Sequence, residues 1–214
     1  MKRMISTALI FGTIASMAFC QDDSKTNNGL ARKATPYYKF SVGTTYLMFV
    51  NFDPEETNTH HYEFHFGYKL TPKDKIGLKV ATWKLFAPMG MPMLEQLKFD
   101  ENNFYPGRIK ESGIGVTYQR LLWKGLFVAV ELLPLKKTYL DENNEEIDNG
   151  FKLYTSYHLG YHIPLFKNRL YIEPQFHCNY WPFDSEGPQG FEEMESNWNN
   201  YLLFEPNLYI GINF

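Results

Sequence analysis

The stretch HHYEFHFGYKL, residues 60–70, decides the fold of this chain. Its even positions hold Tyr62, Phe64, Phe66, Tyr68 and Leu70 together with His60, whereas its odd positions hold histidine, glutamate, glycine and lysine. Successive side chains of a β-strand point to opposite faces, while the 100° step of a helix would mix the two sets. The segment is therefore predicted to be a β-strand with one apolar and one polar face.

The same alternation recurs along the rest of the chain. Seven more segments show it, with the weakest contrast in 126–138: they are 37–50, 76–86, 109–122, 126–138, 151–163, 169–181 and 201–214. Three connections between them are short and rich in turn-forming residues, at 71–75, 123–125 and 166–168. The other four, at 51–59, 88–107, 140–149 and 183–200, are longer and rich in Asn, Asp, Glu, Pro and Gly.

These lengths predict an all-β fold, an eight-stranded antiparallel up-and-down barrel formed by residues 37–214 as a single domain. Short turns would lie at one end, together with both ends of the barrel segment, and long loops at the other. Pro134, Pro174 and Pro206 fall within the predicted strands, where each removes a hydrogen bond of the ladder. We expect bulges or bends at these positions.

The glycines indicate which face of the barrel is inside. Seven mid-strand glycines fall on the polar face: Gly43, Gly67, Gly77, Gly113, Gly115, Gly160 and Gly211. Glycine weakens a strand, but the narrow interior of an eight-stranded barrel needs small residues beside large ones. The polar face is therefore predicted to line the interior and the apolar face to contact lipid. A soluble lipocalin-like barrel, with its apolar face inside, is the alternative.

Composition narrows the class of protein. The chain has 214 residues, of which 17% are aromatic and 21% charged, and its two cysteines are too few for a disulfide scaffold. A net charge of −3 lacks the basic footprint of a nucleic-acid binder, so nucleic acid is not an expected partner. Beyond the first twenty residues there is no apolar run near the roughly 18 residues of a membrane-spanning helix.

The N-terminus is typical of an exported protein. Residues 1–18 combine Lys2 and Arg3 with a long apolar stretch that ends in small residues, which predicts a signal peptide. Residues 19–36 are polar and are predicted to be a flexible periplasmic lead-in. Cys20 lies in a degraded form of the lipoprotein cleavage motif, with Phe19 where a small residue is usual, so a lipid anchor and a plain cysteine both remain open.

The last residues of the sequence resemble those of a known class of proteins. Aromatic residues crowd the strand ends, and the chain stops on Tyr-Ile-Gly-Ile-Asn-Phe, residues 209–214. This ending resembles the terminal strand of bacterial outer-membrane barrels, and residues 37–214 resemble the small eight-stranded class of the OmpA transmembrane domain. The resemblance implies a monomer in the bacterial outer membrane, in contact with lipid and recognised by the barrel assembly machinery through Phe214.

Polar side chains on the interior face form the candidate site. In a low-dielectric tube they must pair with one another or meet water. They are predicted to form an ion-paired plug, with a narrow water-filled conduit as the alternative. The predicted set comprises Lys39, Glu63, His65, Lys69, Lys79, Glu131, Lys152, His158, His162, Arg169, Glu173, His177 and Glu205.

The sequence also offers two chemical alternatives. Ser156 and His158 share one strand face, and Glu131, Glu173 or Glu205 could orient the histidine for acyl transfer to or from lipid. His60 and His61 stand near Asp53, Glu55 and Glu56, but adjacent strand residues point to opposite faces, so no metal or other cofactor is predicted. The main expectation is a structural role in the envelope, or binding and adhesion through the loops.

Overall fold

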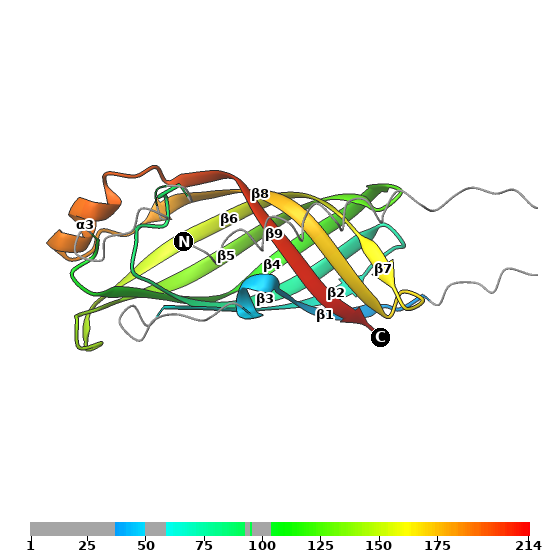
Figure 1. Ribbon diagram of the computed structural model, residues 1–214, viewed down its shortest axis with the longest axis horizontal. Helices are drawn as coiled ribbons and strands as arrows, with labels where there is room; N and C mark the ends of the chain where they lie inside the picture. Colours follow the sequence, from blue (N-terminus) through cyan, green and yellow to red (C-terminus); the bar gives the residue numbers. More distant parts are fainter. Residues whose placement is uncertain (1–36, 50–58, 93–94, 96–103) are drawn as a thin grey trace, which may run out of the picture. The chain divides into compact units, whose positions relative to one another are not determined.

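A computed structural model describes residues 37–49, 59–92, 95 and 104–214, and it shows a closed antiparallel β-barrel (Figure 1). The predicted signal peptide, the lead-in with Cys20, and much of the first two long loops lie outside these residues. The strands are β1 Phe40–Thr45, β2 His60–Lys69, β3 Asp74–Leu85, β4 Arg108–Trp123, β5 Leu126–Leu140, β6 Glu146–Tyr161, β7 Ile163–Leu165, β8 Leu170–Asp184 and β9 Tyr201–Asn213. A 3-10 helix, η1, covers Tyr46–Phe49, and an α-helix, α3, covers Gln189–Glu195.

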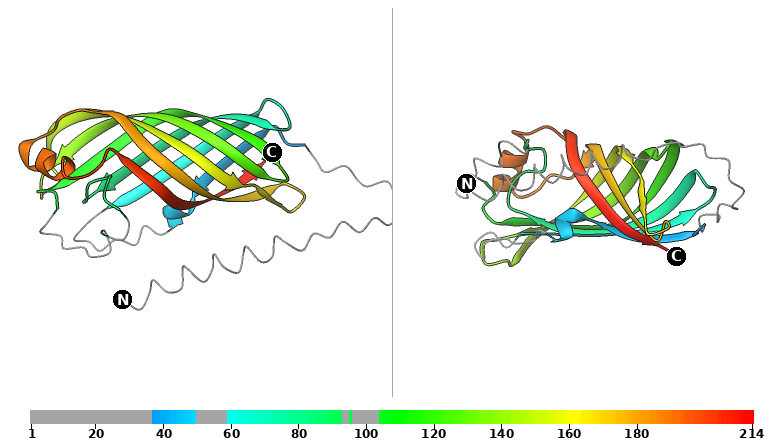
Figure 2. Two further views of the ribbon diagram at one scale, coloured as in Figure 1. Left: turned by 90° about the horizontal axis from the view of Figure 1, so that it is seen from above. Right: turned by 45° about the vertical axis from the view of Figure 1, so that its right-hand side comes forward.

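The predicted eight-stranded barrel is confirmed. β6 pairs with β8 instead of β7, every other strand pairs antiparallel with the next in the chain, and β1 pairs with β9. The short strand β7 continues β6 along β8, since Gly160↔Gln175 and Ile163↔Ile172 share one register, so β6 and β7 form one stave of the wall. The short turns and the end of β9 lie at one end of the barrel, and α3 lies at the other (Figures 1 and 2).

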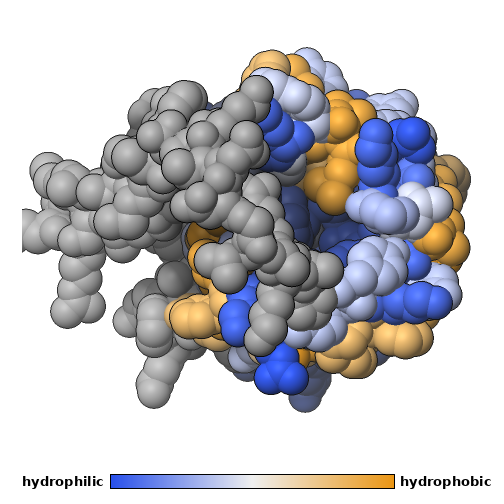
Figure 3. Space-filling model, turned by 90° about the vertical axis from the view of Figure 1, so that its right-hand side faces the viewer, coloured by the Kyte–Doolittle hydropathy of each residue, from blue (hydrophilic) through white to orange (hydrophobic). Residues whose placement is uncertain are grey.

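Alternate side chains face opposite sides of the wall, as the sequence pattern predicts. On β2, Phe66 is 50% exposed whereas Glu63 is only 2% exposed. Seen from the short-turn end, hydrophobic residues lie on the outer wall, and hydrophilic residues surround the central depression (Figure 3). The polar face is therefore the interior.

Two predicted boundaries were wrong. The first strand ends at Thr45 instead of Val50, because Tyr46–Phe49 form η1. The predicted loop 140–149 is instead a tight turn between extended strands: β5 runs to Leu140, β6 starts at Glu146, and the Asp141 N–H donates to the Glu145 carbonyl. The loop 183–200 contains α3.

None of the helices in the described residues has the length and hydrophobicity of a membrane span.

A bulge in β9 changes which side chains face inward. His177 pairs with Glu205 and Asn179 with Leu202, so β9 has one more residue than β8 between these pairs. Phe204, in this bulge, has a φ of 57°, which is uncommon for a bulky residue. Leu202 consequently lines an interior cavity, whereas the alternation predicted it on the outer face.

The bulge lies just before Pro206, where an irregularity is predicted. Of the bulge or bend predicted at Pro134 and Pro174, the bulge is excluded, because the pairing on both sides of each keeps one register. At Pro134 the pairing with β4 is interrupted between Gly113↔Leu135 and Val116↔Leu132 without a shift. A missing N–H removes a hydrogen bond but need not insert a residue.

Among the described residues, the short strand β1 leaves part of the wall without a strand, and η1 lies there in contact with both β2 and β9. This strand pairs with β2 only as far as Gly43↔His65 and with β9 only as far as Thr45↔Tyr209. Beyond these points, among the described residues, no strand stands between residues 60–64 of β2 and 201–208 of β9, and we call this region the side opening. Side chains satisfy backbone groups at its base: the Thr44 hydroxyl donates to the Glu63 carbonyl, and the Leu208 N–H donates to Asn207 Oδ1 at 2.7 Å.

Glycine at position 211 is required by its close neighbours. A Cβ there would overlap the phenol of Tyr171 and lie 2.6 Å from the Val42 carbonyl oxygen. Gly211→Ala should therefore destabilise the barrel by about 1–3 kcal/mol through overpacking. Urea unfolding in non-ionic detergent measures this. Gly190→Ala is the matched control, since its Cβ would meet nothing closer than Pro106 Cγ at 3.2 Å; equal stability of the two variants would contradict the prediction.

Candidate functional site

The barrel interior holds three clusters of charged side chains. The central cluster consists of Glu63, Lys79, Glu131, Glu205 and the polar residues around them. The loop-end cluster consists of Glu111, Lys137, Lys152, Asp184 and Glu195, and the turn-end cluster of Lys75, Gln119, His162 and Glu173. Most of these side chains are largely buried, so their charges need partners within the protein.

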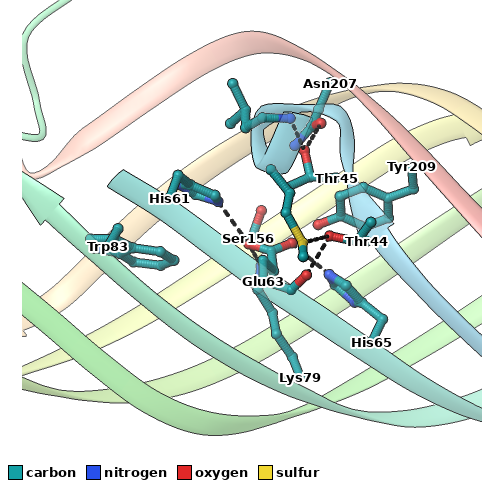
Figure 4. Close-up of polar contacts among 12 residues, drawn as sticks. Thr44, Thr45, His61, Glu63, His65, Lys79, Trp83, Ser156, Asn207 and Tyr209 are labelled. Atoms are coloured by element: carbon teal, nitrogen blue, oxygen red, sulfur yellow. Dashed lines mark hydrogen bonds and ion pairs between the residues drawn. The ribbon is translucent and has the colours of Figure 1, made fainter. Parts of the chain in front are cut away.

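Lys79 is the hub of the central cluster. Its Nζ lies 3.0 Å from Glu63 Oε2 and 2.7 Å from Glu131 Oε2, so one ammonium group is shared by two buried carboxylates. Figure 4 shows Glu63 between Lys79 and the imidazoles of His61 and His65. His61 Nε2 is 3.2 Å from Glu63 Oε2, and His65 Nε2 contacts the other carboxylate oxygen. Positions 61, 63 and 65 meet here because a strand sends alternate residues to one face.

A second chain of contacts runs from β6 to β9. The Ser156 hydroxyl donates to Asn179 Oδ1 at 2.6 Å, and Asn179 Nδ2 donates to Glu205 Oε2 at 2.7 Å. His177 Nδ1 lies 3.4 Å from Ser156 Oγ, and the His177 ring stacks on His158 with centroids 4.9 Å apart. His158 Nε2 is 3.2 Å from Glu131 Oε1 but lacks hydrogen-bond geometry, so this contact is electrostatic only.

The loop-end cluster ties α3 to the barrel. Lys137 Nζ contacts Asp184 at 2.8 Å and Glu195 at 3.0 Å, and Lys152 Nζ contacts Glu111 Oε1 at 2.8 Å. Phe191 of α3 is buried between Tyr105 and Tyr139, with ring centroids 5.2 and 5.1 Å away. Burial raises the pKa of Glu195 although Lys137 favours its ionised form, and burial together with nearby Glu195 raises the pKa of Tyr105.

The turn-end cluster surrounds Glu173. Its Oε1 accepts a hydrogen bond from Gln119 Nε2 at 2.9 Å, and it lies 2.8 Å from His162 Nδ1 and 3.8 Å from Lys75 Nζ. Lys75 also lies over the Tyr171 ring, with its Nζ 5.4 Å from the centroid. Charged groups thus fill the barrel at this end as well.

The structure groups most of the predicted interior residues but not all of them. Lys39 precedes β1 and Arg169 lies in the turn before β8, and both are exposed instead of lining the interior. Lys69 is partly buried at the turn end. The prediction missed Lys75, Glu111, Lys137, Asp184 and Glu195. Lys137 could have been found, since it shares the parity of Glu131 on β5, whereas nothing in the pattern linked Glu195 to it.

A cavity of about 370 Å³ adjoins the central cluster. Its lining combines the aromatic residues Trp83, Tyr154 and Trp181 with polar side chains that include Glu63, His177, Asn179, Glu205 and Asn207. Leu47 of η1, His61 of β2 and Leu202 of β9 come from the elements around the side opening. Pockets of this size accommodate small ligands.

The candidate acyl-transfer residues do not form a triad in this arrangement. Ser156 is 1% exposed and does not line the cavity, and its hydroxyl hydrogen bonds to Asn179 Oδ1. The histidine near it is His177 rather than the predicted His158, which contacts Glu131. A nucleophile must donate its proton to the base and reach the substrate. In the described part of the chain, no group of three or more His, Cys, Asp or Glu residues is arranged to hold a metal ion.

No model of a known protein family matches this chain, and neither a curated protein nor a solved structure matches it. Any inference about function therefore has to come from the barrel itself and from the groups inside it.

Proposed function

We propose that this chain is a bacterial outer-membrane β-barrel protein, a monomer whose role in the envelope is structural or lies in binding and adhesion through its loops. The observation that carries the proposal is the distribution of apolar and charged side chains, which is the reverse of that in a soluble barrel. Large apolar residues are exposed on the staves of the wall, for example Leu78, Val116, Val130, Leu159, Phe176 and Ile212, while lysines and glutamates are buried inside. A soluble barrel would show the opposite arrangement, and a lipid-facing wall explains it.

The contacts within the barrel favour a plugged scaffold over a conduit. The three charged clusters fill the interior with ion pairs, and α3 packs at the loop end through Phe191 and Glu195. Charges removed from water are costly unless they are paired, and these clusters provide the pairing. The loop end, with α3 and the hairpin of β5 and β6, is the surface available for a binding partner.

The end of β9 supports the proposed recognition by the assembly machinery. Phe214 and Phe40 exchange backbone hydrogen bonds of 2.9 and 3.0 Å, and the Phe214 side chain is exposed. An exposed aromatic residue directly beside the closing seam would be accessible to a factor that inserts the barrel.

Heat modifiability tests the proposal. A closed membrane barrel keeps its fold in cold detergent, so detergent-extracted protein should migrate faster on an electrophoresis gel before boiling than after it. The protein should also sediment with membranes and resist extraction by carbonate. Recovery in the soluble periplasmic fraction without detergent would contradict the proposal, as would one gel position before and after boiling.

A further inference from the structure

The cavity beside the central cluster has a chemically uneven lining. The lining includes the aromatic residues Trp83, Tyr154 and Trp181 together with Glu205 and Asn207 of β9. Trp83 and Tyr154 meet edge to face with centroids 5.8 Å apart, and Tyr154 and Trp181 are nearly parallel at 6.3 Å. A ligand that fits this cavity must satisfy both aromatic faces and a carboxylate.

The central cluster carries more negative than positive charge. As defined above, this cluster contains three carboxylates, Glu63, Glu131 and Glu205, and one lysine, Lys79. Lys79 forms ion pairs with Glu63 and Glu131, and His61 and His65 also contact Glu63. Histidine donors can satisfy a carboxylate as neutral groups, so they do not by themselves balance the charge.

Among the described residues, Glu205 is the carboxylate of this cluster without an ion pair. Its one hydrogen bond there is the bond from Asn179 Nδ2. It is partly buried and lines the cavity. A carboxylate out of bulk water is unfavourable unless a positive group pairs with it.

The aromatic walls are suited to a positive group. The face of an aromatic ring attracts cations, most strongly for Trp, and aromatic cages bind ammonium ligands in this way. One ring of the cavity already does so, since Lys152 Nζ lies 5.3 Å from the centroid of Trp181. Sequence and structure thus provide a carboxylate and aromatic faces around one cavity, whose lining also includes Lys79 and Lys84.

We infer that this cavity binds an organic ammonium group that carries an apolar substituent. The ammonium group pairs with Glu205 beside Asn207, and the substituent contacts Trp83, Tyr154 and Leu202. The fit needs only the cavity and its lining, so the site does not depend on where the barrel is located in the cell.

Two sources supply this chemistry. A soluble amine is one, and the headgroup of an aminophospholipid is the other. The lipid source rests on the proposed function, because the side opening would then face the membrane: its borders carry exposed Tyr62 and Phe64 on β2 and exposed Leu203 and Phe204 on β9.

Titration calorimetry on the folded full chain tests the site. In non-ionic detergent and an amine-free buffer, hexylammonium should bind at least tenfold more tightly than neutral hexan-1-ol. Glu205→Gln should reduce hexylammonium binding to the level of hexan-1-ol. Glu173→Gln is the matched control, since it removes a buried carboxylate of the turn-end cluster that does not line this cavity, and it should leave binding unchanged.

Equal binding of hexylammonium and hexan-1-ol to the unmodified protein would overturn the inference, and so would full ammonium affinity in Glu205→Gln. The first comparison uses the unmodified protein and therefore decides the matter even if the variant fails to fold.

Lipid discs separate the two sources. If the headgroup occupies the site, discs of phosphatidylethanolamine should weaken hexylammonium binding at least tenfold relative to discs of a neutral galactolipid. Equal binding in both assigns the site to a soluble amine. Because the detergent measurement needs no membrane, failure of the proposed location and failure of the ammonium site give different results.

Discussion

Lys79→Met is expected to destabilise the barrel by about 3–5 kcal/mol, the usual cost of removing one partner from a buried ion pair. The methionine leaves Glu63 and Glu131 without the ammonium group that they share at 3.0 and 2.7 Å. Both carboxylates are at most 4% exposed, so water cannot replace it. Urea unfolding in detergent, followed by the loss of heat modifiability, measures the change in the free energy of unfolding.

Two further variants show whether charge is the cause. Lys136→Met alters an exposed lysine in β5 and should change stability little. Adding Glu131→Gln to Lys79→Met removes one uncompensated charge and should restore part of the loss, because neighbouring sites that share an interaction are not additive. Wild-type stability of Lys79→Met, or no recovery in the double variant, would show that the interior is held together in another way.

Phe191→Ala should release α3 from the loop end. Phe191 is 1% exposed and packs between Tyr105 and Tyr139, so its loss leaves a cavity that costs about 3–5 kcal/mol. The undocked state of residues 185–200 should therefore become about a hundredfold to a few thousandfold more populated. Limited digestion with a glutamyl endopeptidase measures this population, since Glu192, Glu193 and Glu195 lie in or at the end of the helix.

Gln189→Ala is the control for this experiment. Gln189 is exposed at the start of the same helix, so its replacement should leave the rate of cleavage nearly unchanged. Electrophoretic mobility before boiling should stay that of the folded barrel in both variants. If Phe191→Ala is cleaved no faster than the control, the aromatic contacts do not hold α3 in place.

The alternation of apolar and polar residues was sufficient to predict most of the fold from the sequence. In residues 60–70 the parity of each side chain predicts its face, and the same rule locates Glu63, Lys79, Glu131 and His158 inside. The interior glycines also followed from sequence, because large interior side chains such as Tyr171 need space beside them. Strand pairing between neighbours then requires no long-range information.

The predictions that were wrong concern features that depend on contacts between residues far apart in the sequence. The bulge at Phe204 reverses the parity of Leu202, and no local pattern marks it apart from the nearby Pro206. The end of β1 at Thr45 depends on side-chain bonds from Thr44 and Thr45 to Glu63 and Asn207. The α3 helix is short, and its place is set by Lys137 and two tyrosines from other elements. Such pairings became visible only in three dimensions.

The pairing of β1 with β9 has a consequence for the order in which the barrel forms. Every other pair of neighbouring strands is close in the sequence. This seam instead joins Ser41 to Asn213, which are separated by almost the whole length of the barrel sequence. Closing so long a loop costs more conformational entropy than forming a hairpin, so the seam should be the last contact made during folding. It is also short, from Ser41↔Asn213 to Thr45↔Tyr209. The same line of hydrogen bonds is therefore where the cylinder should first come apart under denaturant.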